Sequence, residues 1–117
     1  MEEMFEIERR GHVTVLSTSE SLKANTAPIL RNAVKKLCCE YRTNLVIDMR
    51  KMPSIDSAGC GALVSSLRGV RISDGEIKIA GPNERVLDTL KLTKLDRVFE
   101  IYQDLDEAIK SFSGPLM

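Results

Sequence analysis

The chain has 117 residues, a length that suits one domain spanning 1–117. Its 17 basic and 17 acidic residues cancel, and it has no tryptophan and few other aromatic residues, which argues against a dedicated nucleic-acid or membrane-surface protein. Its three cysteines lack a CxxC spacing, and with a single histidine, His12, they argue against a disulfide framework or a zinc site. No signal peptide or transmembrane run is visible, so we expect a cytoplasmic protein that binds neither nucleic acid nor membrane.

The first half of the chain predicts a hairpin, a helix and a central strand. Two β-prone runs, 4–10 and 12–17, flank Gly11 and predict antiparallel pairing. A polar loop, 18–25, follows, and Asn25 or Thr26 can then cap a helix that carries Pro28 in its first turn. The run 44–49 is continuously apolar, as in a strand buried on both faces, and Pro53 is expected to close it. The first helix should end near residue 42, with an apolar stripe of Leu30, Ala33, Val34, Leu37 and Tyr41.

The second half alternates between helical and strand patterns. Helices are expected from about residue 57, over 83–92 and over 104–112, and strands over 76–81 and 98–102. The last residues, 112–117, are predicted to fray. The whole pattern predicts an α/β fold with a mixed sheet of four to five strands, mostly parallel with an antiparallel N-terminal hairpin, covered by about four helices.

The segment SIDSAGCGA at 54–62 places one hydroxyl, that of Ser57, at the expected start of the second helix. Loops that follow parallel strands lie at the carboxyl end of the sheet, where open α/β sheets engage ligands. Free N–H groups and the positive end of the helix dipole suit an anion there, such as a phosphoryl group on Ser57. From these residue types alone, a plain helix cap by Asp56 or Ser57, with glycines that permit close packing, is the commoner arrangement. Room for a close approach comes from Ala58, Gly59, Gly61 and Ala62.

The run LVIDMRKMPSIDSAGCGALV at 45–64 resembles the signature of bacterial anti-sigma factor antagonists, in the STAS domain family. The run GEIKIAGPNERVLDTLKLTKLDRVFEIYQDLDEAI at 75–109 resembles the second half of that domain. The resemblance implies a small mixed sheet with helices and a switch that is not an enzyme. By that resemblance, the unphosphorylated protein is expected to bind an anti-sigma factor, usually itself a serine kinase, and so to free the sigma factor. The resemblance further implies that phosphorylation of the serine after the motif aspartate, here Ser57, weakens that complex and that a PP2C-type phosphatase resets it.

From the motif and its surroundings we expect no catalytic residue, metal or cofactor, and a monomer or weak dimer. The sequence departs from the family in three places. The loop 17–28 lacks the common Gly-x-Leu/Ile-Asp, and Lys23 stands about where the aspartate falls. Ala58 replaces a second serine, and Lys94 replaces a common glycine, a local adjustment at a helix end. The partner-binding residues are expected to be Asp56, Ser57, Ala58, Gly59, Gly61, Lys23 and Pro82.

Other classes fit less well. A phosphoaccepting receiver with Asp48 at a strand end lacks the acidic pair that holds magnesium. A serine hydrolase needs a base near Ser57, and His12 is expected in a strand without a carboxylate relay. The remaining alternative is a STAS interaction module of a stress-signalling or transporter complex that phosphorylation does not regulate. For Cys60, a lowered thiol pKa at a helix start competes with simple core filling.

Overall fold

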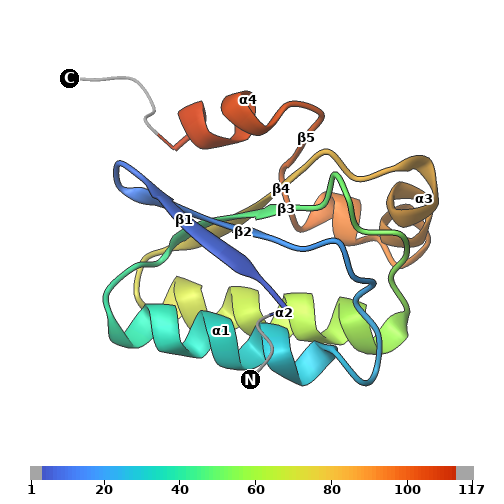
Figure 1. Ribbon diagram of the computed structural model, residues 1–117, viewed down its shortest axis with the longest axis horizontal. Helices are drawn as coiled ribbons and strands as arrows, with labels where there is room; N and C mark the ends of the chain where they lie inside the picture. The colour runs from blue at the N-terminus through green and yellow to red at the C-terminus, as the bar shows by residue number, and fades with distance from the viewer. Residues whose placement is uncertain (1–3, 113–117) are drawn as a thin grey trace.

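The computed structural model describes residues 4–112, which form a five-stranded mixed sheet in the order β1-β2-β3-β4-β5 (Figure 1). Strands β1 and β2 pair antiparallel, and the other neighbouring strands pair parallel. The predicted α/β class, the hairpin and the number of helices are therefore confirmed. The elements are β1 (Glu6–Arg10), β2 (Val13–Ser17), α1 (Ala27–Cys39), β3 (Asn44–Asp48), α2 (Ser57–Ile72), β4 (Glu76–Ala80), α3 (Glu84–Leu92), the 3-10 turn η1 (Leu95–Arg97), β5 (Ile101–Tyr102) and α4 (Leu105–Lys110).

Helices α1 and α2 lie side by side on one face of the sheet, and α4 covers part of the other face (Figure 1). Alternate strand residues divide between the two layers because successive side chains point to opposite faces. In β3, Leu45 and Ile47 join the core beneath α1 and α2, whereas Val46 joins the smaller cluster beneath α4. Burial on both faces explains why the sequence of this strand is continuously apolar.

The hairpin turn and the end of α1 differ from expectation. Gly11 has a φ of +62°, and exposed His12 lies in the turn, so its expected placement in a strand is wrong. Helix α1 ends at Cys39 because Tyr41 adopts a φ of 61° and the N–H of Arg42 bonds to the carbonyl of Leu37, a Schellman motif. Tyr41 is 92% exposed and does not belong to the apolar stripe.

The last strand is shorter than its β-prone sequence suggested. Only Ile101 and Tyr102 pair with β4, because the preceding residues form η1 and the N–H of Phe99 bonds back to the carbonyl of Leu95. Phe99 is buried in the main core instead. Of the predicted frayed end, 113–117 lie outside the described residues, and half-buried Phe112 packs on the cluster beneath α4.

Lys94 occupies the left-handed region, with a φ of 63°, between α3 and η1. A side chain costs about 1–2 kcal/mol in this conformation, and glycine avoids that cost at the expense of a more flexible unfolded chain. Lys94→Gly should therefore raise the free energy of unfolding by about 0.5–1 kcal/mol, or the melting temperature by about 2–4 °C. Urea and thermal denaturation measure the change. Lys35→Gly, inside α1, is the matched control, and its free energy of unfolding should fall by about 1 kcal/mol. Destabilisation by both variants would contradict the prediction.

Candidate functional site

The loop before α2 is tied to the loop before α1 by backbone hydrogen bonds. Leu22 and Ile55 form a parallel bridge. The N–H of Leu22 donates to the carbonyl of Ser54 at 3.1 Å, and the N–H of Asp56 donates to the carbonyl of Leu22 at 3.2 Å. These bonds extend the pairing of the sheet beyond β2 and β3. The position of the residue that follows, Ser57, is therefore fixed by contacts between distant parts of the chain.

Side chains link a third loop to the same edge. The hydroxyl of Ser21 accepts from the N–H of Ser54 at 3.1 Å and lies 2.9 Å from its hydroxyl. Asn83 is the N-cap residue of α3, and its side-chain Nδ2 donates to the carbonyl of Met52 at 3.1 Å. All of these loops follow parallel strands, so the carboxyl end of the sheet presents one connected surface.

Asp56 caps α2, as one of the two sequence interpretations proposed. Its carboxylate accepts from the N–H of Gly59 at 2.9 Å, and its carbonyl accepts from the N–H of Cys60 at 2.9 Å. Ser57 is the first residue of the helix and is exposed. Within residues 4–112, the N–H groups of Ser57 and Ala58 make no hydrogen bond. Two donors at the positive end of the helix dipole therefore remain available to an anion.

The small residues of α2 serve two different purposes. A Cβ on Gly59 would lie 2.3 Å from the carbonyl oxygen of Leu22, so this glycine allows the chain to pack against its own loop. Ala62 is fully buried in the same layer. Gly61 is exposed, and a Cβ there would meet nothing within 4 Å. Only the outer members of the small patch are open to another molecule.

The expected partner-binding residues divide by accessibility. Lys23 is exposed on the loop that pairs with Ile55, at the same end of the sheet as Ser57. Asp56 and Ala58 are half-buried, and Ser57 and Gly61 are exposed. Gly59, in the first turn of α2, and Pro82, in the loop before α3, are both buried.

Cys60 fills a core position beside α3. Its side chain is 5% exposed, and its Sγ lies 3.9 Å from the Oγ1 of Thr93. Burial raises the pKa of the thiol, and the contact with Thr93 only partly opposes that effect. The core-filling interpretation is confirmed, and a lowered thiol pKa at this helix start is wrong.

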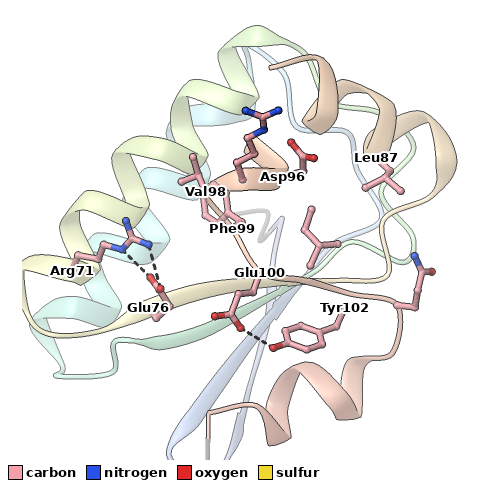
Figure 2. Close-up of a pocket in the computed structure, with 11 residues that line it drawn as sticks. Arg71, Glu76, Leu87, Asp96, Val98, Phe99, Glu100 and Tyr102 are labelled. Carbon is pink, nitrogen blue, oxygen red and sulfur yellow. Dashed lines mark hydrogen bonds and ion pairs between the residues drawn. The ribbon is translucent and has the colours of Figure 1, made fainter. Parts of the chain in front are cut away.

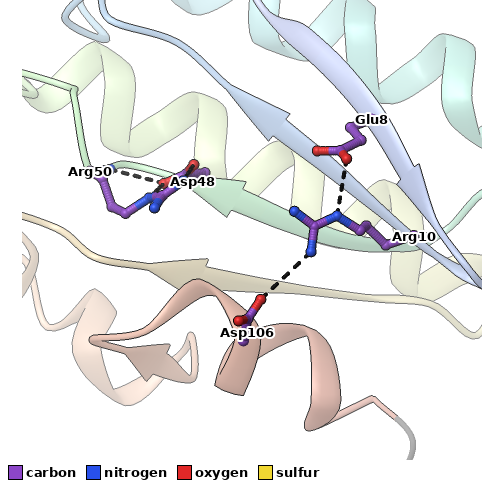
Figure 3. A network of polar contacts seen from close by, with 5 residues as sticks. All are labelled: Glu8, Arg10, Asp48, Arg50 and Asp106. Atoms are coloured by element: carbon purple, nitrogen blue, oxygen red, sulfur yellow. Dashed lines mark hydrogen bonds and ion pairs between the residues drawn. The ribbon is translucent and has the colours of Figure 1, made fainter.

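Asp48, at the end of β3, is engaged by Arg50 (Figure 3). Its carboxylate accepts from the Nε, Nη2 and backbone N–H of Arg50 at 2.9, 2.8 and 3.1 Å. Burial acts to raise the pKa of Asp48, but the hydrogen bonds and charge of Arg50 outweigh it and leave the pKa lowered. The pair orders the loop that leads toward Ser57, which supports a structural role for this strand-end acid.

Figure 3 also shows Arg10 between Glu8, at 3.0 Å, and Asp106, at 3.6 Å, joining β1 to α4.

Asp48→Asn is expected to remove an acid-sensitive part of the stability. Because folding lowers the pKa of Asp48 below its ordinary 3.8, its contribution is complete above that value and is lost as the pH falls through it toward the folded pKa. At neutral pH the variant should lose about 1–3 kcal/mol of unfolding free energy. The difference between variant and wild type should narrow below about pH 4. Urea denaturation across this range tests it, and a difference independent of pH would contradict it.

A hollow of about 810 Å³ lies along β5 and the far end of α2 (Figure 2). Four of its polar side chains form two pairs. Arg71 pairs with Glu76 at 2.9 Å, and the Tyr102 hydroxyl donates to Glu100 at 2.7 Å. Arg71 is also 14 residues from Ser57, about 20 Å along the helix. This hollow is therefore separate from the helix start.

Within residues 4–112, no group of three His, Cys, Asp or Glu side chains is placed to hold a metal ion. No helix in the same range is long and apolar enough to cross a membrane. His12 lies in the hairpin turn between β1 and β2, whereas Ser57 begins the helix that follows β3.

The STAS domain family model matches residues 4–108, so the chain belongs to the STAS domain family. A candidate anti-sigma factor antagonist from Thermotoga maritima is 28% identical over 108 residues, which cover 92% of this chain and 96% of that protein. The crystal structure of a candidate anti-sigma factor antagonist from Thermotoga maritima matches with a TM-score of 0.86 at 28% identity, covering 92% of this chain and 93% of that one. The anti-sigma-B factor antagonist of Listeria monocytogenes is 26% identical over 90 residues, covering 77% and 78% of the two chains. The anti-sigma factor antagonist SpoIIAA, in its unphosphorylated form, shares the fold, with a TM-score of 0.71 at 16% identity over 95% and 99% of the chains.

Proposed function

We propose that this STAS domain protein is an anti-sigma factor antagonist controlled at Ser57. In its unphosphorylated form it binds a serine-kinase anti-sigma factor and thereby frees a sigma factor. The observation that carries the proposal is the exposed Ser57 hydroxyl at the start of α2, beside two N–H groups without a hydrogen bond in the described chain. The names of the Thermotoga and Listeria relatives support the same class.

The geometry suits a switch of surface chemistry rather than of fold. A phosphoryl group on Ser57 adds about −1.5 to −2 charges at pH 7 and three acceptor oxygens. The helix dipole favours that charge by about 0.3–2 kcal/mol, and the neighbouring Asp56 carboxylate opposes it. Because the Ser57 side chain makes no hydrogen bond within residues 4–112, modification removes no such contact that holds the domain together. The new charge instead faces the partner, where each 1.4 kcal/mol lost weakens binding about tenfold.

Phosphorylation and dephosphorylation of Ser57 form a cycle that controls binding. The protein acts in the cytoplasm by binding, without catalysis of its own. The kinase is the anti-sigma factor, and a PP2C-type phosphatase restores the binding-competent form. Asp56, Ala58, Gly61 and Lys23 form the accessible surface around Ser57.

The proposal is tested by intact mass after incubation with Mg-ATP and each serine-kinase anti-sigma factor of the source genome. We expect one phosphate from one kinase, mapped to Ser57 and absent from Ser57→Ala. Ser73→Ala, an exposed serine just beyond α2, is the matched control and should still be modified. Absence of phosphate with every kinase would contradict control at Ser57 and favour an unmodified STAS interaction module.

A further inference from the structure

The two helices on one face of the sheet carry charge of a single sign. Helices α1 and α2 contain no aspartate or glutamate. The whole chain has 17 basic and 17 acidic residues, so the remainder carries 12 basic and 17 acidic residues. The neutral protein is therefore polarised, with a positive helical layer. The basic residues of this layer are all exposed and are Arg31, Lys35, Lys36, Arg68 and Arg71.

A groove of about 310 Å³ lies between the two helices within this layer. Arg31 and Lys35 of α1 form its basic rim, and Arg31 donates to the hydroxyl of Ser65 across it at 3.2 Å. Ser66, 5% exposed, is one of the lining residues, and its buried hydroxyl has no hydrogen-bond partner in the described chain. Buried hydroxyls are rarely left in this state without a reason in function or strain. The other lining residues are Val34, Cys38 and Gly69.

The groove continues the surface that starts at Ser57. Ser57, Gly61, Ser65 and Gly69 are spaced by four residues, so they form one stripe along α2. The stripe spans about 18 Å at 1.5 Å per residue. A Cβ on Gly61 or on Gly69 would meet nothing within 4 Å. A row of small residues with open space above it lets the backbone of another helix come close.

We propose that an acidic helix of the anti-sigma factor packs into this groove, with carboxylates against Arg31, Lys35 and Arg68 and one end beside Ser57. The inference rests on the proposed function and adds the chemistry of the partner. It also gives the switch a physical cause, because a phosphoryl group on Ser57 repels an acidic segment on the same stripe. A base-stacking site is disfavoured since neither helix contains an aromatic residue, and a membrane-inserting face is disfavoured since its large exposed apolar residues are only Ile29 and Ile72.

The direct test compares variants of the full chain for binding to the kinase that modifies Ser57, by calorimetry at low and high salt. Gly69→Met fills the groove without a backbone clash and should weaken binding at least about tenfold, with no fall in melting temperature. Lys35→Glu with Arg68→Glu should weaken binding at least about tenfold at low salt, and the loss of affinity should be smaller at high salt. Lys91→Glu with Lys110→Glu makes the same charge change at exposed sites on α3 and α4, and its affinity for the kinase should stay within about threefold of wild type.

Two results separate this inference from the proposed function. If the groove variants bind like wild type while Ser57→Asp binds weakly, the groove is overturned and the switch at Ser57 stands. If no kinase binds wild type, the proposed function fails, and the groove is tested alone with a synthetic Glu/Leu/Ala helix added to ¹⁵N-labelled protein. Peptide-induced amide shifts at Ser65 and Gly69 that vanish in Lys35→Glu with Arg68→Glu support it. Absent shifts, equal shifts with phosphatidylglycerol vesicles, or shifts from self-association without peptide overturn it.

Discussion

Ser57→Asp should weaken binding of the anti-sigma factor by about ten- to one-hundredfold while leaving the fold intact. One negative charge placed at a docked surface costs roughly 1.4–2.7 kcal/mol when it faces like charge or loses its water. The same charge at the first position of α2 is favoured by the helix dipole, by about 0.3–1 kcal/mol, so the melting temperature should not fall. Calorimetry with the kinase that modifies Ser57 measures the affinity, and circular dichroism checks the fold.

Two variants control for this effect. Ser57→Ala removes the hydroxyl without adding charge, and it should bind within about threefold of wild type and accept no phosphate. Ser73→Asp adds the same charge just beyond α2, at the end away from Ser57, and should leave affinity nearly unchanged. Wild-type affinity in Ser57→Asp, or equal losses in the aspartate variants of Ser57 and Ser73, would contradict a switch located at the helix start.

Gly59→Ala is expected to destabilise the domain by about 1–3 kcal/mol, or about 4–12 °C in melting temperature. The new Cβ would lie 2.3 Å from the carbonyl oxygen of Leu22 and 2.8 Å from the Cγ1 of Ile55. Neither neighbour moves freely, because Leu22 and Ile55 are the bridge that holds the two loops together. The overlap therefore outweighs the gain of about 1 kcal/mol that alanine brings to a helix.

Gly61→Ala is the matched control, since a Cβ there meets nothing within 4 Å. It should raise the free energy of unfolding by about 0.5–1 kcal/mol. Urea denaturation of both variants measures the contrast. Equal stabilities would mean that the loop carrying Leu22 does not constrain the start of α2.

Local patterns predicted the element order and most of the core. The continuous apolar run of β3 and the helical spacing of Leu30, Val34 and Leu37 in α1 each follow from periodicity alone. The prediction that Tyr41 belongs to the apolar stripe of the first helix was wrong because the helical spacing of apolar residues continues past the point where the backbone adopts a left-handed conformation. The predicted strand over 98–102 began too early because the 3-10 turn η1 precedes Val98 and tertiary packing buries Phe99 in the core.

The start of α2 was visible in the sequence, but its surroundings were not. The cap by Asp56 and the exposure of Ser57 follow from local signals. The close approach of Leu22 to Gly59 depends on residues 37 positions apart, which no local pattern reveals. The positive helical layer had only a partial signal in the sequence, because Glu40 lies inside the predicted bounds of the first helix but outside α1, which ends at Cys39. Its groove with Ser66 required the packing of α1 on α2.

The most direct measurement is the dissociation constant of the anti-sigma factor for the unmodified protein and for the same protein phosphorylated at Ser57, determined side by side with ADP present. We expect phosphorylation to raise the dissociation constant at least about one-hundredfold, equivalent to about 2.7 kcal/mol, with an unchanged circular dichroism spectrum. Equal dissociation constants for the two forms would contradict a binding switch at Ser57.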